Sequence, residues 1–288
     1  MTSRFAKALR SPPGRILIGL AACFVFPFAV KTILVPLLSA TGLPEETARV
    51  IRHGLSIVAL YLSYVLCFRL LERRPITEMS LKHLPREAGI GLGAGFAAIG
   101  GIFLVLFLAG TYSSGPAHPS LPVLFTVVSI TMLAFLEEVL FRCVLYRVLE
   151  EWLGTVTALL ISALVFGLMH ITNVSVTPLG IASAVFGGAL MGILFTWTKR
   201  LWVPTFFHAA WNLGQVTLLG NVSGAEDFVG LFHGRLEGPR LLVGSKFGVE
   251  DSLPGVMVPL AILVVLFVLA RRSGRLVSRG RKPGRPPA

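Results

Sequence analysis

Apolar residues in this chain arrive in long blocks separated by short polar segments. Eight blocks can be marked, at residues 16–38, 55–68, 88–110, 121–136 and onward, 153–172, 178–198, 202–220 and 253–270. Most are close to the roughly 20 residues that a helix needs to cross about 30 Å of hydrocarbon, and the short second block can be extended at either end. The blocks lack the alternation of polar and apolar residues that is typical of barrel strands. The pattern therefore predicts an all-α fold, a polytopic transmembrane helical bundle of about eight helices.

The composition is that of a membrane protein and not of a soluble domain. Hydrophobic residues make up 54% of the chain and charged residues 14%, against roughly 25% charged residues in soluble domains. The first block is too long for the apolar region of a signal peptide and has no clear cleavage site, so we expect a retained helix. We expect a single membrane-embedded domain over residues 1–270, which includes an external loop at 221–252, and a basic, disordered cytoplasmic tail over 271–288.

The basic residues indicate a membrane topology and not a nucleic-acid partner. The formal net charge is +12, and Lys and Arg gather before the first block, after the second, between the sixth and seventh, and in the tail. The alternate loops carry no basic excess. By the positive-inside rule this predicts an integral, multi-pass membrane protein with both termini cytoplasmic. We expect contact with anionic lipids near the basic tail and no nucleic-acid partner; the sequence does not specify the oligomeric state.

Small residues within the apolar blocks are expected to serve packing. Cys23, Cys67 and Cys143 lie in or beside these blocks without the spacing of metal ligands, and we expect no disulfide among them. Glycines recur at four-residue intervals, as at Gly91 and Gly95, and such faces let two helices approach closely.

The fourth block contains the least expected charges of the chain, the adjacent Glu137 and Glu138 followed by Arg142. Ionisable groups at membrane depth are costly and mark candidate functional sites. On a helix, Glu138 and Arg142 are i and i+4 and can pair, whereas Glu137 points about 100° away and has Phe141 at its own i+4 position. A carboxylate without a cationic partner can take a proton from water, as a general base does. The simpler interpretation is a buried charge cluster that fixes helix packing.

Two later blocks supply polar groups that could complete a site with Glu137. His170 follows Phe-Gly-Leu-Met, and His208 is followed by Asn212 at i+4, so that these two side chains share one helix face. Two neutral hydrogen-bond donors on one face suit a developing oxyanion. A lone histidine in such a helix more often bonds to a neighbouring helix, but three helices that each contribute a polar group favour a common site.

The depth of these groups gives a geometric condition for their meeting. If the fourth and fifth helices turn near residues 153–154, Glu137 and His170 both lie roughly 25 Å from the turn at 1.5 Å per residue. His208 lies only about 10 Å from the basic boundary at 199–200 by the same rise. The levels agree only if the hairpin of the fourth and fifth helices projects beyond the other turn, which predicts a site in the cytoplasmic half of the membrane.

Three short motifs, in this order on separate predicted helices, resemble those of the CAAX-protease and bacteriocin-processing (CPBP, or ABI) family of intramembrane glutamic endopeptidases: Glu137-Glu138-x-x-x-Arg142, Phe166-x-x-x-His170 and His208-x-x-x-Asn212. The resemblance covers about residues 121–219. One departure is Cys143, where many members have glycine, and its side chain is added at a tight helix contact.

The resemblance implies a role for each matched residue and an endopeptidase that needs no cofactor or metal. Glu137 would activate a water for attack on the scissile carbonyl, and His170 would help to position that water. His208 and Asn212 would stabilise the oxyanion. Glu138 and Arg142 would hold the site together. The implied substrate is a membrane-associated protein or peptide, whose identity the sequence does not give.

Other functions stay open at this stage. One glutamate and two histidines could hold zinc with an open position for water, although the chain has no His-Glu-x-x-His motif. The polar cluster could also serve a transporter, or a membrane scaffold without peptidase activity. An aspartyl mechanism is excluded, because the only aspartates are Asp227 and Asp251 in one loop. A serine mechanism lacks a Gly-x-Ser-Gly motif.

Overall fold

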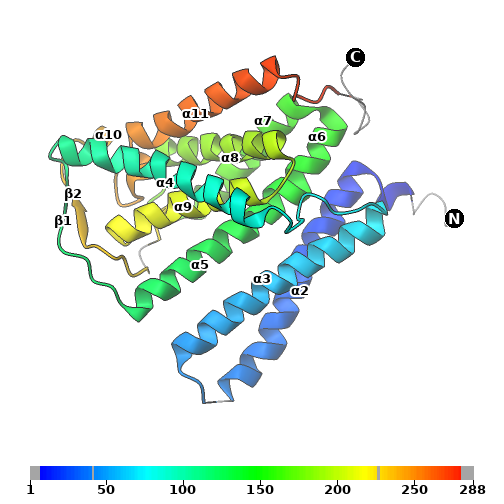
Figure 1. Ribbon diagram of the computed structural model, residues 1–288, viewed down its shortest axis with the longest axis horizontal. Helices are drawn as coiled ribbons and strands as arrows, with labels where there is room; N and C mark the ends of the chain where they lie inside the picture. Colours follow the sequence, from blue (N-terminus) through cyan, green and yellow to red (C-terminus); the bar gives the residue numbers. More distant parts are fainter. Residues whose placement is uncertain (1–6, 41, 226–227, 280–288) are drawn as a thin grey trace.

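The computed structural model describes residues 7–40, 42–225 and 228–279, and nearly all of its regular structure is helical (Figure 1). The long helices coincide with the eight apolar blocks: α2 (Pro12–Ser39), α3 (Glu45–Glu72), α4 (Leu84–Leu108), α5 (Leu121–Glu138), α7 (Thr155–Met169), α8 (Pro178–Thr198), α9 (Trp202–Leu219) and α11 (Leu253–Arg272). After α5 the helical path continues through the π-helical segment η1 (Val139–Tyr146) into α6 (Arg147–Leu153). The predicted helical bundle is confirmed, and α3 extends the second block at both ends.

Seven helical segments of the described chain are long and apolar enough to cross a membrane, and α9 is the long helix that is not among them. Its 18 residues include His208, Asn212 and Gln215, and such polar side chains lower its mean hydropathy. Most of its residues are nevertheless buried, because α4, α5 and α8 pack against it. The least apolar of the predicted helices is therefore enclosed by the others, which is where polar groups at membrane depth are tolerated.

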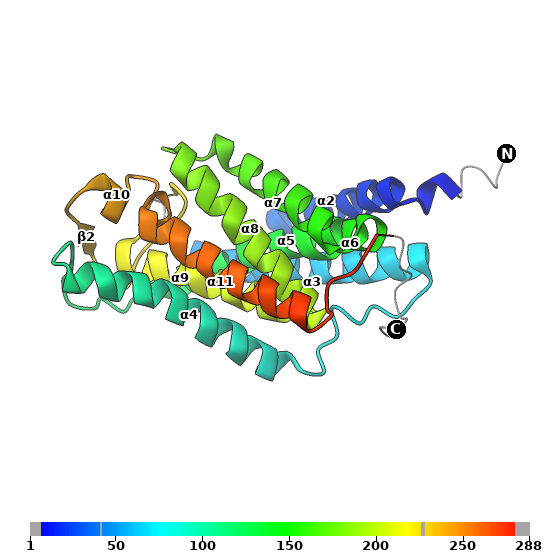
Figure 2. The same ribbon diagram turned by 90° about the horizontal axis from the view of Figure 1, so that it is seen from above.

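Close helix packing follows the small residues that the sequence singled out. A Cβ atom at Gly91 would lie 2.7 Å from the Val203 carbonyl oxygen, and one at Gly95 would lie 2.5 Å from the Phe207 carbonyl oxygen. These glycines let α4 approach the backbone of α9. Figure 2 shows α4 and α7 on opposite sides of the bundle, with α8 and α9 between them. The α2–α3 hairpin lies at one side and contacts η1 and α5 (Figure 1).

The predicted external loop is a folded segment, which we call the cap (residues 221–225 and 228–252). It contains the strand β2 (Gly234–Leu236), the helical turn α10 (Arg240–Val243) and the 3-10 turn η3 (Val249–Asp251). The strand pairs antiparallel with β1 (Tyr112–Ser114), so the fold is not entirely helical. The Tyr112 hydroxyl donates a hydrogen bond to the Leu218 carbonyl (3.2 Å), which ties β1 to the end of α9.

The first residues of the predicted tail contact the bundle. Arg271 and Arg272 belong to α11. The Thr155 amide donates to the Val277 carbonyl (2.9 Å), and the Val277 amide donates to Thr155 Oγ1 (2.8 Å). These bonds occupy the first turn of α7, where helical N–H groups lack partners. Residues 280–288 lie outside the described residues.

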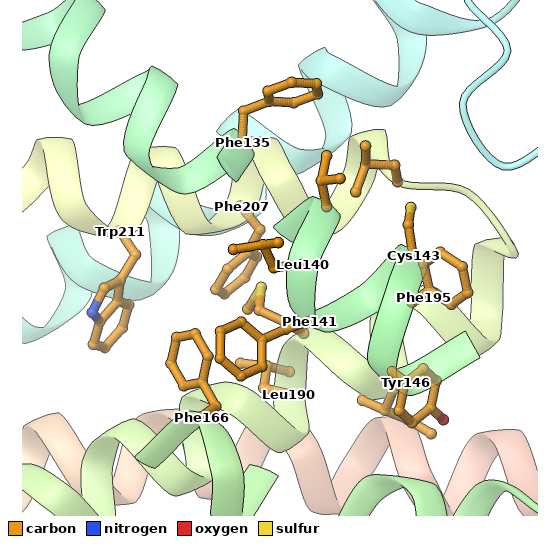
Figure 3. Packing of buried hydrophobic residues seen from close by; sticks show 14 of the residues in the cluster. Phe135, Leu140, Phe141, Cys143, Tyr146, Phe166, Leu190, Phe195, Phe207 and Trp211 are labelled. Atoms are coloured by element: carbon orange, nitrogen blue, oxygen red, sulfur yellow. The ribbon is translucent and has the colours of Figure 1, made fainter. Parts of the chain in front are cut away.

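The aromatic core surrounds the junction of α5, η1, α7 and α9. Figure 3 shows Phe141, Phe166 and Phe207 grouped beside Leu140, with Trp211 to one side. Cys143 belongs to the same core and is fully buried, and all three cysteines are free thiols. The junction that carries the adjacent Glu137 and Glu138 is thus packed on several sides.

Candidate active site

A cavity of about 570 Å³ brings together the candidate residues of three helices. Glu137 of α5, His170 at the end of α7, and His208 and Asn212 of α9 all line it. The predicted meeting of these four groups is confirmed. Glu138 and Arg142 do not line the cavity but lie behind it, and both are completely buried.

Glu138 and Arg142 form the ion pair that their spacing predicted. Arg142 Nη1 lies 3.0 Å from Glu138 Oε1. Arg142 Nη2 donates to the Gly188 carbonyl of α8 (3.1 Å), and the guanidinium lies 4.8 Å from the centre of the Phe166 ring. Arg142 is therefore an internal link between η1, α7 and α8.

The pair stands on a π-helical turn and not on the α-helix that the periodicity predicted. In η1 the Arg147 amide bonds to the Arg142 carbonyl, where an α-helix would use the Cys143 carbonyl. The released Cys143 carbonyl accepts bonds from the Tyr64 hydroxyl (3.2 Å) and from Arg147 Nε (3.0 Å). Side chains of α3 and α6 thereby replace the missing backbone bond.

His208 contacts both glutamates, a contact that no local spacing in the sequence indicates. Its Nδ1 lies 2.9 Å from Glu138 Oε1, the oxygen that also pairs with Arg142. Its Nε2 lies 3.8 Å from Glu137 Oε2. His208 and Asn212 share the cavity face of α9, as predicted, but the imidazole is oriented by Glu138, 70 residues earlier in the chain.

His170 does not lie inside a helix, as the apolar block had suggested. The α-helix ends at Met169, and His170 begins the 3-10 turn η2 (His170–Thr172). The chain turns away because Asn173 has an extended backbone and its side-chain amide donates to the Ser223 carbonyl of the cap (3.0 Å). His170 Nδ1 donates to the Phe166 carbonyl (2.9 Å), which leaves Nε2 as the ring nitrogen that is not used in this bond.

The depth condition is met in the geometry of the helices. The chain turns at Gly154, whose φ of +85° favours glycine, and in Figure 1 the turn between α6 and α7 projects beyond the connection between α8 and α9. The cavity also reaches the cap, since Ser223, Gly224 and Glu250 line it. The side of the membrane on which the site lies stays a prediction.

Two comparisons with known proteins identify the family of the chain. The family model described as "Type II CAAX prenyl endopeptidase Rce1-like" matches residues 119–214. A Bacillus subtilis (strain 168) protein named "Putative membrane peptidase YdiL" is 30% identical over 193 residues, which are 60% of this chain and 75% of the relative. The chain belongs to the Rce1-like CAAX endopeptidase family. The resemblance seen in the sequence is confirmed, and the protein is a multi-pass integral membrane protein of a peptidase family. No solved structure matches the chain.

The Rce1-like match contains every candidate site residue and leaves out the elements around them. Glu137 and Asn212 both lie inside residues 119–214, whereas α2, α3, the cap and α11 lie outside. The match thus covers the inner helices that carry the cavity. Within the described residues, no three His, Cys, Asp or Glu side chains are grouped so that they could hold a metal ion.

Proposed function

We propose that this protein is an intramembrane endopeptidase that hydrolyses a peptide bond of a membrane-associated protein or peptide, with Glu137 as the general base. The observation that supports this most is the difference between the two adjacent glutamates. Glu138 is completely buried and paired, while the Glu137 side chain keeps 24% of its exposure and faces the cavity. A base has to reach the water that it activates, and the cavity that Glu137 faces offers a place for that water.

In the proposed reaction, a water bound beside Glu137 gives a proton to the carboxylate as its oxygen attacks the scissile carbonyl carbon. The resulting tetrahedral intermediate carries an oxyanion. When the intermediate collapses, the carbon–nitrogen bond breaks and Glu137 returns the proton to the leaving amine. His170 helps to hold the water, because Nδ1 is committed to the Phe166 carbonyl and the neutral ring then offers Nε2 as an acceptor.

Asn212 and His208 are the proposed donors to the oxyanion. The Asn212 amide donates without any change of protonation. His208 has Nδ1 turned to Glu138, so its Nε2 carries a proton at the same time only when the ring is an imidazolium. The neighbouring carboxylates of Glu138 and Glu137 favour that charged ring. Glu138 and Arg142 are positioning residues, since they hold His208 and do not line the cavity.

A comparison of membrane-protein termini in cells tests the proposal and reveals the substrate. Cells that contain the wild-type protein should produce new termini that are absent with Glu137→Gln, because the amide keeps the shape but cannot accept the proton. Glu237→Gln, on an exposed part of the cap, is the matched control and should leave the termini unchanged. Identical termini with wild type and Glu137→Gln would point instead to a scaffold or a transporter.

A further inference from the structure

Carboxylates outnumber cationic side chains in the lining of the cavity, even when His208 carries a charge, although the protein as a whole is strongly basic. Two carboxylates line the cavity, those of Glu137 and Glu250, and no Lys or Arg is among the described residues that form its wall, although the whole chain has a formal net charge of +12. Most of the remaining lining is apolar. A cavity of this kind favours a cationic group over a neutral or anionic one of the same size.

Glu250 is held by neutral donors and forms no ion pair with any residue that the structure describes. Its Oε1 accepts a hydrogen bond from Trp211 Nε1 (2.8 Å), and its Oε2 accepts one from the Ser223 hydroxyl (2.5 Å). The adjacent Asp251 differs, because it has Arg240 Nη2 at 3.5 Å and is buried. The negative charge of Glu250 is therefore left uncompensated at the edge of the cavity.

The position of Glu250 is tied to the proposed catalytic residues through α9. Trp211 lies three residues after His208 on that helix, it also lines the cavity, and it is 7% exposed. In Figure 3 Trp211 lies apart from the Phe166 and Phe207 rings, and its indole nitrogen points away from them. A carboxylate held at the edge of an indole ring is a favourable setting for an ammonium or guanidinium group, because a charge-assisted hydrogen bond to the carboxylate can combine with attraction to the face of the nearby ring.

We propose that Glu250 and Trp211 form a subsite for a Lys or Arg side chain of the substrate. The subsite fixes which peptide bond reaches Glu137, because the cap and α9 hold the carboxylate at a set position along the cavity. This inference rests on the proposed function, since it names a preference of the same site. It assigns to the cap, which lies outside the matched family region, the recognition of one substrate residue.

Peptide binding to the full-length protein in nanodiscs tests the subsite without any need for cleavage. In a Glu137→Gln background, an uncharged apolar peptide is compared with peptides in which one Lys, or one Glu, is placed at each position in turn. We expect one position at which Lys improves the dissociation constant about tenfold and Glu weakens binding, as for one charge-assisted hydrogen bond. Adding Glu250→Gln should remove this preference, and adding Glu250→Lys should reverse it in favour of Glu.

The reversal separates recognition from a purely structural role of Glu250, since a collapsed cap would weaken all peptides alike. Glu237→Gln on the exposed face of the cap is the control and should keep the preference for Lys. Equal binding of all peptides, or a preference for Lys that survives Glu250→Lys, would overturn the subsite. A failure of the proposed function would be seen in a separate cleavage assay, in which the Glu137→Gln protein would cleave as fast as the wild type.

Discussion

Burial separates two side chains that have the same chemistry and adjacent places in the sequence. Glu138 has no exposed surface, and one of its oxygens contacts both Arg142 and His208. Glu137 has no cationic Lys or Arg partner in the described chain and reaches the cavity. The i to i+4 spacing predicted the ion pair, but it could not predict His208 as a partner, because that contact depends on how α9 packs against α5.

Loss of Arg142 should destabilise the protein more than loss of the whole pair. Arg142→Met takes away the arginine partner of the buried Glu138, and loss of one partner of a buried ion pair typically costs about 3–5 kcal/mol, whereas Glu138→Gln with Arg142→Met removes both charges of the pair. We expect a lower unfolding midpoint in detergent for the single variant than for the double variant. If the midpoint of the double variant fell by the sum of the separate effects of Glu138→Gln and Arg142→Met, the two residues would not be coupled.

Glu78, in the segment between α3 and α4, should make stability depend on acid pH. Burial alone would raise its pKa, but the hydrogen bonds from Arg74, the nearby Arg147 and the Tyr64 hydroxyl together lower the pKa from 4.5 to about 2. A lowered folded-state pKa adds stability above pH 4.5 that is lost as the pH falls towards 2, up to about 3 kcal/mol.

The free energy of unfolding of wild type and Glu78→Gln, measured at pH 7 and near pH 3, checks this dependence. The difference between the two proteins should be largest at pH 7 and should shrink on acidification. Glu237→Gln changes an exposed carboxylate on the cap and serves as the control. A difference that is the same at both pH values would contradict the assigned interactions.

At the scale of elements, the ends and irregularities of helices were harder to predict than their existence. The apolar blocks located the long helices, because the number of consecutive apolar residues needed to cross a membrane can be read directly from the sequence. They missed η1, because this π-helical turn depends on hydrogen bonds that the Tyr64 and Arg147 side chains donate to the Cys143 carbonyl. They also missed the end of α7 at Met169, because the apolar block runs on to residue 172, whereas the turn depends on the distant bond from Asn173 to the cap.

The contact between α4 and α9 should be sensitive to one methyl group at Gly95. A Cβ there meets the Phe207 carbonyl at 2.5 Å, one residue before His208, so Gly95→Ala must push α9 away. We expect a loss of about 1–3 kcal/mol in stability and a reduced rate of cleavage, measured on the same preparation. Gly93→Ala, on the same helix with open space around it, should be neutral or slightly stabilising. Equal effects of the two substitutions would rule out the close approach.

At the scale of the whole molecule, the bundle and the meeting of three motifs were predictable, while the cap and the ordered start of the tail were not. The pairing of β1 with β2 joins residues more than a hundred positions apart, and Val277 bonds to Thr155 across a similar separation. Such contacts carry no local pattern. The cytoplasmic location of both termini and the contact with anionic lipids stay predictions, based on the positions of basic residues.

The cap contributes to the cavity from outside the matched inner helices. It closes one part of the cavity with Ser223, Gly224 and Glu250 and also holds the end of α7 through Asn173. This position suits the proposed role of the cap in substrate recognition, since binding residues are often placed on loops held by a rigid scaffold.

Cleavage of a peptide substrate by purified wild type and Glu137→Gln is the most direct test of the central claim. We expect kcat/KM to fall by about 10²–10⁴-fold with Glu137→Gln, the usual contribution of a general base, while the unfolding midpoint stays close to that of the wild type. Glu237→Gln should cleave at the wild-type rate. Undiminished cleavage by a folded Glu137→Gln protein would contradict Glu137 as the base.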